Sequence, residues 1–135
     1  MDLLMTAKTL AERVESEAVR MHVPVSVSIV DVHGNLVLQH RMNDAPAYSM
    51  EISERKAYTS ALVGRRTAEL DALVQPGQSL YALLAMAGGR YTAMAGGVPL
   101  KHEGRVFAGV GVSGGTTEQD VAIVDSALSE SNTNG

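Results

Sequence analysis

The first apolar residues of the chain recur at intervals of three and four, at Leu3, Ala7, Leu10, Val14, Ala18 and Met21. This spacing puts them on one face and predicts an amphipathic helix with a buried stripe. Pro24 ends the predicted helix, because the residue before a proline is disfavoured in the helical conformation.

Alternation of apolar and polar residues then predicts a β-hairpin. Residues 25–31 alternate as expected of a half-buried strand, and residues 36–41 return as its partner. Gly34 and Asn35, which tolerate a positive φ, suit the tight turn between them.

The second half of the chain predicts further helices around a second group of strands. A helical region runs from Ser49 to Leu73, with Gly64 as a candidate break. The later elements are a short helix from Ser79 ending at Gly88, two or three strands turning near Gly104, a last helix capped by Thr116 or Thr117, and a polar tail over Ser129–Gly135. Hairpin-linked strands flanked by helices predict one α+β domain over residues 1–135, with a mostly antiparallel sheet.

One predicted strand has a face almost without side chains. Val106, Ala108, Val110 and Val112 form its apolar face, whereas Gly109, Gly111 and Ser113 form the other face. Glycine weakens a strand, so two glycines on alternate positions indicate that something approaches the backbone closely. The pattern leaves open whether this is a packed helix or a ligand.

Composition narrows the classes of function. The net charge is −4, there is no cysteine, and aromatic residues make up 4% of the chain. We therefore expect no nucleic-acid partner, no disulfide and no thiolate metal site. The chain also lacks a long apolar run and a basic N-terminal region, so we expect a cytoplasmic protein with no membrane association.

The glycine-rich segment and the acidic start of the last helix, Gly111–Asp120, resemble the GlcG/HbpS-like family, also called the haem-degrading domain. The C-terminal domain of PduO belongs to that family. Similar matches lie at Gly96–Leu100, at Ser28–Asp31 with Gly34, at Arg41 and at Lys56–Ala57. The resemblance implies a profilin-like three-layer α/β/α fold with a five-stranded antiparallel sheet. It also implies homo-oligomers, often octamers, and haem binding in some members.

Two histidines are candidates for an axial ligand to haem iron. His22 follows the first helix, where it would bind iron or simply interact with the helix dipole. His40 shares its strand face with Leu36 and Leu38, which predicts that it points toward the apolar side. His33 and His102 lie in predicted turns and are expected to be solvated.

Other residues are candidates for holding the anionic groups of a ligand. Gly114 and Gly115 precede a helix, where free backbone N–H groups favour a carboxylate or phosphate. Arg41 and Lys56 are the candidate cations. The candidate wall of the pocket is the face formed by Gly109, Gly111 and Ser113.

Three hypotheses for function follow. The first is a homo-oligomer that binds haem or a related tetrapyrrole through His22 or His40, for storage, sensing or slow degradation. The second is a catabolic enzyme in which Lys56, His40 or Asp31 transfers a proton at a carboxylated substrate. The third is an accessory subunit without a site of its own.

Overall fold

The computed structural model describes residues 1–133 and has an antiparallel sheet at its centre. Its strands are β1 (Ser26–Asp31), β2 (Leu36–Arg41), β3 (Gly97–His102) and β4 (Arg105–Ser113). They lie in the order β2-β1-β4-β3. The α+β class and the antiparallel pairing are confirmed, but the sheet has four strands, so the expectation of five is wrong.

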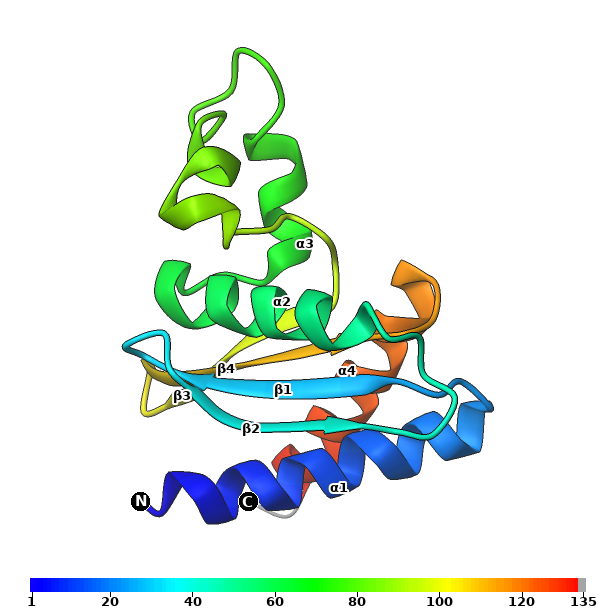
Figure 1. The fold of residues 1–135 in the computed structure, drawn as a ribbon. Helices are drawn as coiled ribbons and strands as arrows, with labels where there is room; N and C mark the ends of the chain where they lie inside the picture. The colour runs from blue at the N-terminus through cyan, green and yellow to red at the C-terminus, as the bar shows by residue number, and fades with distance from the viewer. Residues whose placement is uncertain (134–135) are drawn as a thin grey trace.

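Helices cover both faces of the sheet (Figure 1). Helices α1 (Leu3–Met21) and α4 (Thr117–Thr133) lie on one face, and α2 (Ser49–Val63) lies on the other. The main core fills the space between the sheet and the pair α1 and α4, and its fully buried members include Val14, Val27, Val110 and Ile123. Within the described residues, no helix is both long and apolar enough to span a membrane.

The face between the sheet and α2 is built from small and polar residues. The hydroxyls of Ser26 and Ser49 are hydrogen-bonded at 2.8 Å, and those of Ser28 and Ser53 at 2.7 Å. A Cβ added at Gly111 would lie 2.7 Å from the backbone nitrogen of Ala57. Small residues therefore allow α2 to pack directly on the sheet backbone.

A β-bulge changes the alternation expected along β4. Leu100 pairs with Ala108 and Lys101 pairs with Val106, so Phe107 is the extra residue. Phe107 packs against the main core, whereas Val106 lies on the side of the sheet that faces the end of α2, near Gly64. The predicted apolar face therefore does not include Val106, and Phe107 takes its place against the main core.

A segment after α2 projects away from the sheet (Figure 1). Gly64 ends α2 in the left-handed conformation, as expected of a break, and α3 (Thr67–Leu70) follows. The predicted helix from Ser79 is absent; short 3-10 turns at Leu83–Ala85 and Ala87–Gly89 take its place. Arg55 donates to the carbonyl of Gly89, which ties this segment to α2.

The start of α4 agrees with the prediction and its end does not. The hydroxyl of Thr116 accepts from the N–H of Gln119 at 3.1 Å, and the Gln119 side chain accepts from the N–H of Thr116 at 2.8 Å. This is a reciprocal capping box. Helix α4 continues to Thr133, so residues 129–133 are helical where a polar tail was predicted, and the last two residues of that predicted tail, 134–135, lie outside the described residues.

Candidate functional site

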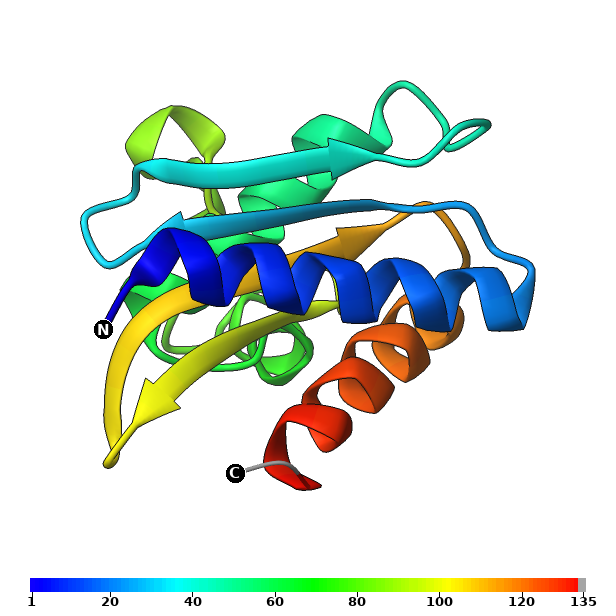
Figure 2. The same cartoon turned by 90° about the horizontal axis from the view of Figure 1, so that it is seen from below.

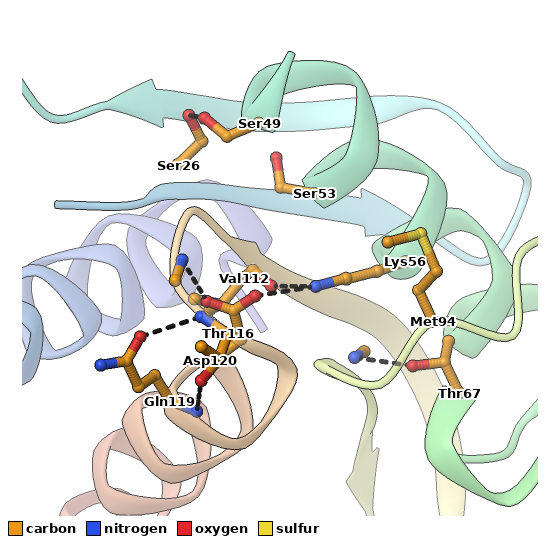
Figure 3. A network of polar contacts seen from close by, with 12 residues as sticks. Ser26, Ser49, Ser53, Lys56, Thr67, Met94, Val112, Thr116, Gln119 and Asp120 are labelled. Atoms are coloured by element: carbon orange, nitrogen blue, oxygen red, sulfur yellow. Dashed lines mark hydrogen bonds and ion pairs between the residues drawn. The ribbon is translucent and has the colours of Figure 1, made fainter. Parts of the chain in front are cut away.

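A buried ion pair joins α2 to the start of α4 (Figure 3). The Nζ of Lys56 donates to the carboxylate of Asp120 at 3.2 Å and to the carbonyl of Val112 at 2.7 Å. The two side chains are only 1% and 3% exposed. Val112 lies beyond the paired length of β3, whose ladder ends at Gly97 opposite Gly111, so the lysine supplies a donor to a carbonyl near the end of the sheet.

Asp120 also fills the glycine-rich turn before α4. Its second carboxylate oxygen accepts from the backbone N–H of Gly115 at 2.9 Å. A Cβ at Gly114 would lie 2.8 Å from the Cα of Val25, so this glycine is needed for close packing. The predicted cradle for a ligand anion at Gly114 and Gly115 is therefore occupied by the protein's own carboxylate.

The buried position of Lys56 shifts the pKa of its ammonium group. Burial lowers the pKa of the Lys56 ammonium below its usual value of 10.5, and the neighbouring Asp120 carboxylate opposes this shift. Desolvation is the larger of the two effects. Because the amine already donates to two protein oxygens, it is arranged as a structural group.

The glycine face of β4 is covered by α2. A Cβ at Gly109 would lie 2.6 Å from the hydroxyl of Ser60, and Ser113 is buried on the same strand. The sequence left open whether a helix or a ligand packs against these glycines, and in the structure it is a helix, α2. The space that the sequence assigned to a ligand against Gly109, Gly111 and Ser113 is filled by protein.

His40 lies at the exposed edge of the sheet, on the side of α1. Its Nδ1 is hydrogen-bonded to the Oε1 of Glu15 at 2.6 Å, and its side chain is 48% exposed. The predicted face is correct, since Glu15 belongs to α1. Burial is lower than expected because β2 is an edge strand.

His22 is exposed and ends α1. It adopts the left-handed conformation with φ 60°, and its backbone N–H donates to the carbonyls of Ala18 and Val19. The backbone therefore has a capping role, while the imidazole faces solvent. Within the described residues, no three His, Asp or Glu side chains gather as a metal site.

Asp31 and Arg41 have local structural contacts. The carboxylate of Asp31 accepts from the backbone N–H groups of His33 and Asn35 at 2.9 and 3.0 Å, which stabilises the hairpin turn. The guanidinium of Arg41 donates to the carbonyl of Ala45 at 3.2 Å. Asp31 therefore acts as a hydrogen-bond acceptor within the hairpin turn.

The three residues predicted to transfer protons are not brought together. Asp31 lies opposite Ala108 on β4, four residues from the Val112 carbonyl that Lys56 contacts. This is about 13 Å along a strand. His40 lies on the α1 side of the sheet, whereas Lys56 extends from α2 on the other side.

Two carboxylates that organise these residues were missed in the sequence. Asp120 was predicted only to lie at the acidic start of the last helix, and no role was predicted for Glu15. Their partners come from elements 64 and 25 residues away. Local spacing carries no signal for such contacts.

Comparison with known proteins places the chain in a family. The family model described as "Haem degrading protein HbpS-like" matches residues 4–129. An uncharacterized 15.0 kDa protein from the dhaT-dhaS intergenic region of Citrobacter freundii is 44% identical over 125 residues, covering 93% of this chain and 88% of the relative.

Solved structures agree with this match. The Klebsiella pneumoniae protein ORFY is 40% identical with a TM-score of 0.89, covering 93% of this chain and 87% of ORFY. A PduOC:haem complex is 37% identical with a TM-score of 0.87, covering 91% of this chain and 89% of PduOC. The resemblance drawn from the sequence is thereby confirmed, and this chain belongs to the GlcG/HbpS-like family of haem-degrading proteins.

Proposed function

We propose that this protein binds haem or a related tetrapyrrole. The observation that carries the proposal is its similarity, at 37% identity and over 91% of its length, to PduOC, which has been solved as a haem complex. Membership of a family described as haem-degrading supports the same class of ligand.

His40 is the residue of this chain that best fits an axial iron ligand. A metal-binding histidine usually has its second ring nitrogen hydrogen-bonded to a carboxylate or carbonyl, which orients the ring and raises its basicity. Glu15 holds Nδ1 of His40 in this way at 2.6 Å. This arrangement leaves Nε2 as the free nitrogen of a half-exposed ring.

The surface beside His40 also suits a large flat ligand. Glu12, Glu15, Ser16 and Val19 line an open depression on α1 of about 500 Å³. Val19, one of these residues, is 63% exposed. A bound haem would supply redox-active iron there, and the chain would orient it through His40. His22 is the second candidate ligand, since its imidazole is exposed at the end of the same helix.

A hemin titration followed by absorbance tests the proposal. We expect a saturable shift of the Soret band with a defined number of haems per chain. A response that does not saturate would contradict haem binding. Because the family is described as haem-degrading, the loaded protein is then followed with a reductant under air, and loss of the Soret band would indicate degradation.

We also propose that the chain assembles into a homo-oligomer. Tyr81, Leu84 and Met86 are 59%, 41% and 57% exposed on the projecting segment, and exposed apolar residues that gather on one segment are typical of a protein–protein interface. Native mass spectrometry gives the subunit number, and an octamer is the expected result. A monomer at micromolar concentration would contradict assembly.

A further inference from the structure

A groove lies between α1, β3 and α4, on the opposite side of the sheet from α2. Its volume is about 590 Å³, within the usual range of small-molecule sites of about 300–1,000 Å³. Seen from below, α1 and α4 approach one another at one end and diverge toward the N-terminus of α1 (Figure 2). The groove lies where the two helices no longer cover the strands together.

The floor of the groove is apolar. Leu10 and Leu100 are largely buried, and Phe107 and Leu128 are partly buried against the main core. Phe107 is the single phenylalanine of the chain, and it is the extra residue of the β-bulge. Bulges often redirect a side chain next to a functional site. Here the bulged residue is itself Phe107, and its aromatic ring forms part of the floor of the groove.

The charged residues that line the groove are both cations. Arg13 on α1 and Lys101 on β3 line it, and the lining includes no aspartate or glutamate among residues 1–129, although the net charge of the chain is −4. Among the side chains that the structure describes, those of residues 1–129, neither cation has a hydrogen-bond or ion-pair partner. Arg13 is also half-buried, so its guanidinium would gain more from an anionic partner than a fully solvated one.

We infer that this groove binds a free amphipathic monocarboxylate. Its alkyl or aryl body would lie on Leu10, Phe107 and Leu128, and its carboxylate would pair with Arg13 and Lys101. The chemical match is specific: an apolar floor excludes small hydrophilic anions, and unpaired cations favour a charged head group over a neutral one.

This groove is separate from the surface proposed for haem. Arg13 and Glu15 are two residues apart on α1, and residues with this spacing point to different sides of a helix. Glu15 faces His40 on β2, whereas Arg13 lines the groove beside β3 and α4. The two proposals can therefore succeed or fail independently.

Calorimetric titration with decanoate, with decanol as the neutral match, tests the inference. We expect one decanoate per chain, and binding of decanol at least about tenfold weaker. Arg13→Gln should weaken decanoate binding about tenfold or more. Thr9→Glu, which adds a negative charge at an exposed position of the lining, should weaken it as well.

Lys8→Gln is the matched control, because it removes a cation from an exposed position of α1 outside the groove lining. It should leave decanoate binding within about twofold. The inference is overturned if decanoate does not saturate, if decanol binds equally well, or if Arg13→Gln and Lys8→Gln behave alike.

Two further measurements separate the alternatives. Saturating hemin should leave decanoate binding unchanged, and competition between them would overturn the separation of the two sites. A third outcome is that decanoate fails to bind the parent protein and that Thr9→Glu dissociates an oligomer in native mass spectrometry. The groove would then be an interface between copies of the chain, and the inference would be wrong.

Discussion

The ammonium of Lys56 and the carboxylate of Asp120 lie 3.2 Å apart in the interior of the protein, with both side chains almost completely buried. The pair joins the helix on one face of the sheet to the start of a helix on the other face. Asp120 also accepts from the Gly115 N–H, so one carboxylate holds the lysine and the glycine turn together.

Removing one partner of this pair should strongly destabilise the fold. Asp120→Ala leaves a buried ammonium without its counter-charge, and we expect a loss of about 3–5 kcal/mol in the free energy of unfolding. Urea denaturation measures it. Lys56→Met/Asp120→Leu, which removes both charges, should recover part of the loss. The matched control is Arg66→Ala, since the partly exposed Arg66–Asp125 pair should contribute less than about 1 kcal/mol.

The lowered pKa of Lys56 gives a second prediction about stability. Between that lowered pKa and 10.5, the unfolded chain binds a proton at this lysine that the folded chain has released. The free energy of unfolding should therefore rise with pH across this window. Comparison with Lys56→Met at each pH cancels the other titrating groups. We expect the free energy of unfolding of the parent protein, minus that of Lys56→Met, to increase as the pH approaches 10.5. A decrease in this difference would contradict the prediction.

The glycines of β4 should not tolerate a side chain. Gly111→Ala would place a Cβ 2.7 Å from the backbone nitrogen of Ala57, so α2 would have to move. We expect a loss of about 1–3 kcal/mol, as for overpacked cores, measured by thermal unfolding. Gly77→Asn is the control, because a Cβ there meets nothing within 4 Å and asparagine tolerates the positive φ. Equal losses at the two positions would rule out the packing explanation.

The capping box of α4 should contribute measurably to stability. Thr116→Ala removes the hydroxyl that accepts from the Gln119 N–H at 3.1 Å, and we expect a loss of about 1 kcal/mol. Thr117→Ala changes the next residue, whose exposed side chain makes no hydrogen bond in the described structure, and should have almost no effect. Chemical denaturation of the two variants side by side gives the comparison.

The His40–Glu15 pair should control haem affinity if His40 binds the iron. His40→Ala should abolish the Soret shift, and Glu15→Gln should weaken hemin binding about 10- to 100-fold, since the carboxylate orients the ring. His33→Ala in the hairpin turn is the control and should bind as the parent protein does. Loss of the shift in His22→Ala alone would instead assign the ligand to His22.

Local sequence patterns determined most of the elements of this protein. Apolar periodicity predicted α1, alternation predicted the first hairpin, Gly64 predicted the end of α2, and a cap at Thr116 or Thr117 predicted the start of α4. These features depend on contacts within a few residues, which is why they can be read from the chain. The motif resemblance identified the family for the same reason, because its residues lie in short continuous segments.

Only the tertiary structure decided what these residues face. The alternating glycines required a close neighbour, but the packing of α2 on β4 made that neighbour a helix. The backbone N–H of Gly115 was predicted to bind a ligand anion at the start of a helix, but in the structure it donates to the carboxylate of Asp120. Lys56 and Asp120, like His40 and Glu15, meet across 64 and 25 residues of chain. Such pairings depend on how the layers stack and on where an edge strand leaves a side chain open to water, and neither is encoded in local spacing.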